Sequence, residues 1–528
     1  MTNSRKFYRK LFARLVAGCL IVFLSGWLWA QTTTQPPPPS SATQSTEKSP
    51  QGNGQADPSK PQAVEPPNSA KPEDGARPPQ GEIAEPSQET KISPKDADEL
   101  FRSVDEILKF ASKDTGLPIK QEVKRRLTSR DEVVAYLQKN MAEDKDAQRL
   151  RRSELVLKKF GLLPRDFNLQ TFLLALLREQ VAGYYDPKTK AVNLLDWVDI
   201  DQQRPVMAHE LTHALQDQSF GLEKWMKGAG DLAESGGEPT SEDIEKDEIS
   251  TARQAVVEGQ AMVVLVDYLL APTGQSLLDS PQIVAALKAG MLVGTPDSIQ
   301  FRNAPLFLKE ALTFPYRYGL DFETELLAKG GKDKAFANVF KNPPSSSREI
   351  MEPQTYLAGE HVTPLPLPNF KSIFKNYERF DIGAIGEFDT AILIDQYAGS
   401  DASHALYPHW RGAYYYAVRP KGDPPDPLGL VYVSRWSNAE HAAEFGAIYA
   451  KSLLKRYLHV HDVTHGGQDA AATLDHLETL VGKHVFLTEE GTVVVEVRDD
   501  TMLVTESLDE VSTGKLEQEV LPAATASK

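Results

Sequence analysis

His209-Glu210-Leu211-Thr212-His213 is the stretch of sequence that decides how this chain of 528 residues is interpreted. On a helix, His209 and His213 lie on one face about one turn apart, so their imidazoles can bind the same metal ion. Zinc accepts histidine nitrogen at about 2.0–2.1 Å. Glu210 lies roughly 100° around such a helix, where it can take a proton from a metal-bound water. The spacing predicts a metal-binding helix with Glu210 as general base.

The residues around this stretch predict that one side of the helix is buried. Met207, Leu211, Ala214 and Leu215 form an apolar stripe on the face opposite the two histidines. A helix of this kind packs its apolar face into a core while the other face lines a cleft. A surface helix with two solvated histidines is the alternative.

A site of this type needs a third ligand. A histidine six residues after His213 would complete one kind of zinc site, but that position is Ser219. A carboxylate from a later helix is the other common solution. Glu258 is the only charged residue in the apolar stretch 254–266, and an ionised carboxylate there is costly unless it is paired or binds a metal. Gly259 beside it allows another backbone to come close.

Two alternatives to a Glu258 ligand stay open. Glu258 could form a buried ion pair with Arg253. Asp217, one turn after His213, could be the ligand instead, or it could orient an imidazole without touching the metal. We expect Zn²⁺ to be bound by His209, His213 and Glu258, with Asp217 supporting a histidine.

These residues resemble the gluzincin type of zinc metallopeptidase. The match consists of His209–His213 and the later segment Glu258-Gly259-Gln260-Ala261. The longer string His209–Gln218 is similar to a group of poorly characterised exported bacterial proteins that are interpreted as metallopeptidases. That group also has a Gly-x-Tyr-Asp-Pro turn, a Phe-Pro-Tyr-x-x-Gly segment and a Pro-Pro-x-Ser segment, matched here by Gly183–Pro187, Phe314–Gly319 and Pro343–Ser346. The resemblance covers roughly residues 120 to 358.

The resemblance implies a mostly helical, zincin-like metallopeptidase domain with a small sheet, and a reaction that hydrolyses peptide bonds. It also implies that the strand expected at Ala191–Leu195 is a sheet edge that pairs with an extended peptide substrate. The residues of that strand that would bind substrate are Val192, Asn193 and Leu194. An ordinary strand inside a sheet is the alternative.

The Phe314–Gly319 segment offers a further catalytic group. Tyr316 or Tyr318 would donate a hydrogen bond to the oxyanion in the transition state. A tyrosine in the core or in a loop, without a catalytic role, is the alternative.

The chain also departs from the resembled proteins. Met262 stands where gluzincins often carry an acidic residue that supports a histidine, so that support must come from elsewhere. Met351-Glu352-Pro353 stands where the group reads Leu-His-Pro.

The N-terminal residues predict export. A basic start precedes the apolar run Leu15–Ala30, and polar residues follow, which is the layout of a signal peptide spanning residues 1–30. An uncleaved membrane anchor is the alternative. Residues 31–92 are rich in Pro, Ser and Gln and cannot bury a core, so we expect a disordered linker. The only cysteine is Cys19, so a mature chain would contain no thiol and no disulfide.

Local signals predict where three helices lie. Ser93-Pro94 is a cap followed by proline at the first helical position, so a helix is expected to start there. A second set of helices is expected to begin at Pro205, and a long helix is expected to start between Ser241 and Thr251 and to run to Leu270.

The remaining chain is expected to have an α+β fold. A metallopeptidase domain is expected at 93–360, a smaller α+β domain at 370–510 and a tail at 511–528. In the second domain we expect strands at Tyr414–Val418 and Leu430–Val433, a capping box at Ser437–Glu440 and an antiparallel set between Phe486 and Thr505. Three histidines, His459, His461 and His465, could bind a second metal, but solvated side chains in a flexible loop are the interpretation that we favour.

Together these features predict an exported zinc metallopeptidase, periplasmic or extracellular, that acts on a peptide or protein. The net charge of −16 argues against nucleic acid as a partner. Contact with a membrane is expected only through an uncleaved N-terminal anchor. The alternatives are an inactive scaffold or binding protein of the cell envelope, and a zinc hydrolase that acts on something other than peptides.

Overall fold

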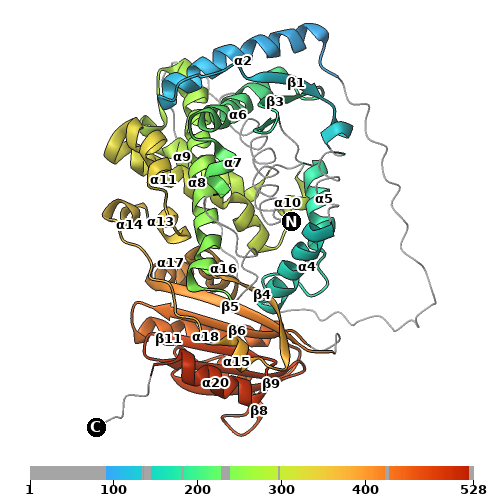
Figure 1. Ribbon diagram of the computed structural model, residues 1–528, viewed down its shortest axis with the longest axis vertical. Coiled ribbons are helices and arrows are strands. Elements are labelled where there is room, and N and C mark those ends of the chain that lie inside the picture. Colours follow the sequence, from blue (N-terminus) through green and yellow to red (C-terminus); the bar gives the residue numbers. More distant parts are fainter. Residues whose placement is uncertain are drawn as a thin grey trace, which may run out of the picture.

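The computed structural model describes residues 91–133, 135, 144–179, 183–227, 238–294, 298–422 and 427–522. The expected signal peptide, Cys19 and all but the last two residues of the expected linker lie outside these ranges. The architecture is α+β, as predicted, with a helical part that lies against a large antiparallel sheet (Figure 1).

The helical part holds most of the helices in the described chain. They are α2 (Pro94–Thr115), α4 (Asp144–Lys159), α5 (Leu169–Glu179), α6 (Ile200–Phe220), α7 (Leu222–Lys227), α8 (Ser241–Leu270), α9 (Pro281–Val293), α10 (Ile299–Arg302), α11 (Leu306–Lys332), α12 (Val339–Lys341), α13 (Ser347–Met351) and α14 (Pro353–Ala358). The 3₁₀ helices η1 (Ala271–Thr273) and η2 (Leu277–Asp279) and the π-helix η3 (Asp333–Asn338) connect some of them.

The small sheet of the helical part has three strands. They are β1 (Lys124–Thr128), β2 (Tyr184–Asp186) and β3 (Ala191–Leu195), so the strand predicted at 191–195 is confirmed. Their order is β1-β3-β2, with β1 parallel and β2 antiparallel to β3. β3 is therefore the central strand, and all five of its residues are buried.

Polar caps start the helices that matter most here. Ser93 caps α2, with Pro94 at its first position, as predicted. Thr240 and Asp243 form a capping box at the start of α8. The start expected for α6 at Pro205 is wrong: the helix begins at Ile200 because Asp199 caps it, and the proline lies inside its second turn.

α8 is the central helix of the protein. Within the described residues, the stretch Ser241–Thr273 is long and apolar enough to cross a membrane, but 72% of its apolar window is buried inside the protein. It packs against α6 and α11, and near its start it contacts β4. Its apolar character is therefore explained by its place in the core.

The C-terminal part is built on a sheet of eight strands. They are β4 (Tyr377–Ala384), β5 (Trp410–Pro420), β6 (Gly429–Trp436), β7 (Val460–Asp462), β8 (Gln468–Asp469), β9 (Gly482–Thr488), β10 (Gly491–Arg498) and β11 (Thr501–Glu506). Their order is β4-β5-β6-β11-β10-β9-β7-β8, and every pair is antiparallel. The strands predicted within β5, β6, β9, β10 and β11 are confirmed.

Helices cover both faces of this sheet. They are α15 (Phe370–Ile373), α16 (Glu387–Ala398), α17 (Ser400–Leu406), α18 (Ala439–Arg456), α19 (Ala471–Leu474) and α20 (Glu510–Val520), with the short turn η4 (Tyr407–His409). On β6, Leu430 and Tyr432 join the large core that includes the helical part, whereas Val431 and Val433 join a second core with Leu516 of α20. Successive side chains of a strand point to opposite faces, which explains this division.

Two expectations for this part need correction. Asn438, and not Ser437, caps α18, because its side chain accepts a hydrogen bond from the backbone N–H of His441. The segment assigned to a tail begins with α20, whose Leu516 is fully buried. Residues 523–528 lie outside the described ranges.

Buried charges join the two parts. The ammonium of Lys159, at the end of α4, lies 2.8 Å from Glu490 and 3.7 Å from Glu506. Glu506 also pairs with Arg456.

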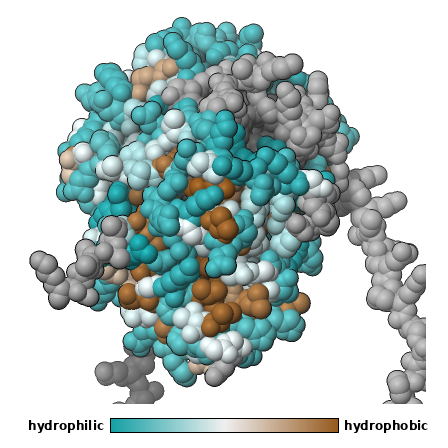
Figure 2. All heavy atoms as spheres, turned by 60° about the horizontal axis from the view of Figure 1, so that its bottom comes forward, coloured by the Kyte–Doolittle hydropathy of each residue, from teal (hydrophilic) through white to brown (hydrophobic). Residues whose placement is uncertain are grey.

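The C-terminal end of the protein shows hydrophobic side chains scattered among hydrophilic ones (Figure 2). The large exposed hydrophobic residues of this part are Leu458, Val463, Val481, Leu487 and Val511.

Candidate metal centre

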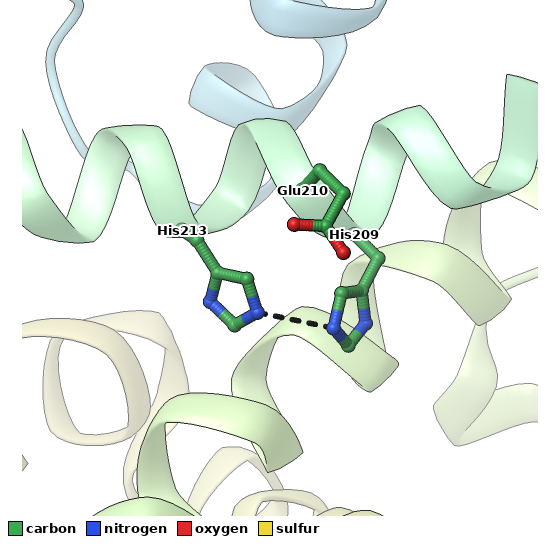
Figure 3. Close-up of side chains that lie close together, drawn as sticks. All are labelled: His209, Glu210 and His213. Carbon is green, nitrogen blue, oxygen red and sulfur yellow. Dashed lines mark hydrogen bonds between the residues drawn. The ribbon is translucent and has the colours of Figure 1, made fainter. Parts of the chain in front are cut away.

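α6 carries the His209–His213 stretch into the interior of the protein. The side chains of His209, Glu210 and His213 lie together (Figure 3), and the residues are 0%, 2% and 7% exposed. The apolar stripe of the same helix, Met207, Leu211, Ala214 and Leu215, is also buried. The alternative of a surface helix with solvated histidines is therefore wrong.

Three donor atoms from two helices meet at this point. The Nε2 atoms of His209 and His213 are 3.0 Å apart, as the dashed line in Figure 3 marks. The Oε2 atom of Glu258 on α8 lies 3.2 Å from His209 Nε2 and 3.4 Å from His213 Nε2. The structure thus brings together the three residues that the sequence nominated as metal ligands.

The donor set fits a tetrahedral cation. Three donors that each lie about 2.0–2.1 Å from one tetrahedral zinc ion are roughly 3.3–3.4 Å from each other. The three observed separations range from 3.0 to 3.4 Å. Two imidazole nitrogens and one carboxylate oxygen also match the protein ligands of a catalytic zinc site, in which water takes the fourth position.

The charges of the three groups depend on one another. Burial raises the pKa of Glu258, but the charge of His213 and hydrogen bonds from both histidines bring it down to about 2. Burial lowers the pKa of His213, but the attraction of Glu258 raises it to about 9. Burial dominates at His209 and lowers its pKa to about 4. A proton on His213 therefore balances Glu258, and a bound cation would replace that proton.

Arg253 does not take the role of ion-pair partner for Glu258. Its guanidinium donates a hydrogen bond to the backbone oxygen of Trp225, and it lies 4.9 Å from the centre of the Trp225 ring. The contacts of Glu258 are instead with the two histidines. This arrangement favours the ligand interpretation over a structural ion pair.

The backbones of α8 and α11 touch beside Glu258. A Cβ atom added to Gly259 would lie 2.3 Å from the backbone oxygen of Gly319, and one added to Gly319 would lie 2.3 Å from that of Ala255. Only glycine permits such a close crossing. The sequence segments Glu258–Ala261 and Phe314–Gly319 thus meet in space at this contact.

The same contact places Tyr316 near the metal centre. Its ring is fully buried and stacks against the ring of His209, with centroids 6.2 Å apart. Tyr318 instead packs against Phe314 and Phe388, and burial raises its pKa to about 12. The structure therefore brings Tyr316, rather than Tyr318, to the site; its role as an oxyanion donor stays a prediction.

One oxygen of Glu210 is held and the other has no partner. The backbone N–H of Tyr185 on β2 donates a 2.7 Å hydrogen bond to Glu210 Oε2. Oε1 is buried and makes no hydrogen bond among the described residues. Burial raises the pKa of this carboxyl to about 7, against the lowering effect of His213 and of the Tyr185 N–H.

Gln216, and not Asp217, supports a histidine. The Nδ1 atom of His213 lies 2.9 Å from Gln216 Oε1. Asp217 instead accepts hydrogen bonds from the Tyr185 hydroxyl at 2.9 Å and from Lys190 at 2.5 Å. The roles predicted for Asp217, as a ligand or as the partner of an imidazole, are therefore wrong, because its side chain points to β2 and the following turn.

The substrate role predicted for Val192, Asn193 and Leu194 is also wrong. β3 lies between β1, which pairs with all five of its residues, and β2, which pairs with its first three. The backbone of Leu195 is bonded to the side chain of Gln203. Val192, Asn193 and Leu194 are at most 4% exposed. An inner strand has no free edge to offer to an extended peptide.

Sequence reasoning missed three residues that shape the site. Tyr185 holds Glu210, Gln216 holds His213, and Gln260 accepts a 2.8 Å hydrogen bond from Gln216. Gln216 could have been found, because residues three apart on a helix are neighbours. Gln260 was visible as the polar side chain nearest to Glu258 in the apolar stretch 254–266.

The histidines of the C-terminal part form no second centre of this kind. His459, His461 and His465 are exposed, and His465 pairs with Asp462 at 2.8 Å. Across the described ranges, the close group of side chains that could hold a metal ion is formed by His209, Glu210 and His213, with Glu258 beside the two histidines. Their exposure agrees with the solvated interpretation favoured above, but the expected flexible loop is wrong for His461, which lies in β7.

Comparison of the chain with family models, with curated proteins and with solved structures finds no match in any of the three. The site is therefore interpreted from its own geometry.

Proposed function

We propose that this protein is a zinc-dependent metallopeptidase of the gluzincin type. The observation that carries the proposal is the convergence of His209 Nε2, His213 Nε2 and Glu258 Oε2 within 3.0–3.4 Å of one another. A buried carboxylate with an oxygen free of hydrogen bonds, Glu210, lies next to these donors. This is the set of groups that metal-assisted hydrolysis requires.

Each side chain of the site would have its own role in the reaction. A bound zinc ion supplies a Lewis acid and lowers the pKa of a bound water. Glu210 would accept a proton at Oε1 and later return it to the leaving amine, while the Tyr185 N–H holds Oε2 in place. Tyr316, stacked beside His209, would restrict the orientation of that imidazole. Gln216 would do the same for His213.

The variant Glu210→Gln tests the catalytic part of the proposal. It keeps the shape of the side chain but removes the proton acceptor, so we expect peptide hydrolysis to fall at least about 100-fold while zinc content is unchanged. Zinc is measured by elemental analysis, and hydrolysis with a peptide library. Full activity in this variant would remove Glu210 from the mechanism.

The variant Glu258→Ala tests the ligand assignment. We expect bound zinc to drop sharply, because one of three protein ligands is lost. Glu248→Gln is a matched control, since Glu248 is a buried carboxylate of the same helix that bonds to Ser347 instead. If Glu258→Ala and the control retain equal zinc, another carboxylate is the ligand.

A binding protein without catalytic activity is the second candidate. One feature favours it: a pocket of about 50 Å³ lies where the start of α8 meets β5, lined in part by Glu245, Glu248, Leu365, Trp410 and Tyr414. A binding protein would keep its biological role with Glu210→Gln. A zinc hydrolase for other substrates would bind zinc but leave every library peptide intact.

We also propose that the protein is exported. The support is the order of basic and apolar residues in the segment 1–30. Fractionation of expressing cells, with N-terminal sequencing of the product, tests it. A chain that stays in the cytoplasm with Met1 intact would contradict export, whereas an intact N-terminus in the membrane fraction would indicate an anchor.

A further inference from the structure

Glu323 on α11 is a buried carboxyl without a structural explanation. The residue is 0% exposed, and in the described part of the chain neither of its oxygens makes a hydrogen bond. A buried polar group without a partner destabilises a protein. The side-chain amide of Gln260 lies beside it and interacts with it, without the geometry of a full hydrogen bond.

Gln260 belongs to a chain of amides that ends at the metal centre. His213 Nδ1 faces Gln216 Oε1 at 2.9 Å. Gln216 Nε2 donates to Gln260 Oε1 at 2.8 Å and to the backbone oxygen of Val257 at 3.0 Å. Gln260 Nε2 donates to the backbone oxygen of Ala335 at 2.6 Å.

The direction of this chain determines which nitrogen of His213 carries the proton. Backbone oxygens only accept hydrogen bonds, so each amide must turn its NH₂ group toward its carbonyl and its oxygen the other way. Gln216 then presents an acceptor to His213, which places the imidazole proton on Nδ1 and leaves the Nε2 lone pair for a metal. The reversed chain would put the proton on Nε2, where it would block the metal.

We infer that Glu323 is a positioning residue of the metal centre, which acts through Gln260 and Gln216 to keep the His213 Nε2 lone pair available. Its carboxyl oxygen stands beside the NH₂ group of Gln260 and opposes the reversed orientation, which would bring two oxygens together. This inference rests on the proposed zinc site. It explains why a poorly paired carboxyl lies among the apolar buried residues Leu320, Phe322 and Leu326 of α11.

Burial raises the pKa of the Glu323 carboxyl well above its usual value, which favours the neutral acid. A neutral carboxyl presents one accepting oxygen, as the amide of glutamine does. Glutamine should therefore replace Glu323 in this role, whereas leucine should not.

The test compares stability with zinc affinity in the full chain. We expect Glu323→Leu to raise the melting temperature of the metal-free protein, because it removes a buried polar group. The same variant should weaken zinc binding on the order of tenfold, measured by competition with a chromophoric chelator. Glu323→Gln should bind zinc within about twofold of the unchanged protein.

Two further variants separate the inference from simpler explanations. Leu326→Ala, which truncates a fully buried residue of α11, should lower the melting temperature and leave zinc affinity unchanged. Gln260→Leu should weaken zinc binding at least as much as Glu323→Leu, and it provides the test if that variant does not fold.

The outcomes distinguish this inference from the proposed function. If Glu323→Leu and Gln260→Leu bind zinc as tightly as the unchanged protein, the positioning role is wrong while the zinc site stands. If the unchanged protein binds no zinc at all, both are wrong.

Discussion

The glycine contact between α8 and α11 is a precise point at which to perturb the metal centre. In Gly259→Ala, the new Cβ would lie 2.3 Å from the backbone oxygen of Gly319. Carbon and carbonyl oxygen approach each other to about 3.3–3.6 Å in close helix contacts. The two helices would therefore have to separate by roughly 1 Å, since neither backbone can turn aside.

This separation should affect both stability and metal binding. Overpacking of a well-packed core typically costs about 1–3 kcal/mol. Glu258 precedes the substituted position directly, and metal–ligand distances tolerate changes of only about 0.2 Å. A shift of roughly 1 Å exceeds that tolerance several times, so we expect zinc affinity to fall roughly 100-fold or more.

Gly514→Ala provides the control, because a Cβ at Gly514 in α20 would meet nothing within 4 Å. This variant should gain up to about 1 kcal/mol from helix propensity and keep its zinc affinity. Thermal unfolding by circular dichroism and chelator competition measure the two quantities. If Gly259→Ala keeps both its melting temperature and its zinc affinity, the close crossing of the helices does not position Glu258.

Further predictions follow from the support of His213 and from the buried charges at the junction of the two parts. Gln216→Leu should weaken zinc binding about 10–100-fold, measured by chelator competition, because Gln216 holds His213. Asp217→Asn should leave zinc binding nearly unchanged. If the two variants weaken zinc binding equally, Asp217 supports the metal centre after all. Glu506→Gln should cost about 3–5 kcal/mol in urea unfolding, because it leaves Arg456 buried without its anion, and a loss under 1 kcal/mol would refute the pairing. The charges of Arg456 and then Lys159 outweigh burial and lower the pKa of Glu506, so its stabilising effect is complete above the ordinary value of 4.5 and is lost as the pH falls below it. Unfolding curves between pH 7 and pH 3 should therefore show a smaller acid-dependent loss in Glu506→Gln than in the unchanged protein.

Local sequence patterns were sufficient for most of the helices and strands. The cap at Ser93, the strand Ala191–Leu195 and the helix that ends at Leu270 follow from residues within a few positions of each other. Errors occurred where two local signals competed. α6 begins after the cap Asp199 and not at Pro205, and Asn438 rather than Ser437 caps α18.

The candidate site was predictable only in part. The spacing of His209 and His213 is a property of one helix, and burial logic pointed to Glu258. Asp217 was chosen for its charge and its distance of one turn, but its side chain is held by Tyr185 and Lys190 in the tertiary structure.

The sequence by itself determined that two imidazoles would share one helical face, since helix geometry depends only on nearby residues. It also determined that a lone carboxylate in an apolar helix would need a partner, since burial of an unpaired charge is costly. Only the tertiary structure decided that the partner was the histidine pair, and that β3 is an inner strand. Strand order and helix crossing depend on contacts between residues far apart in the chain, and no local pattern encodes them.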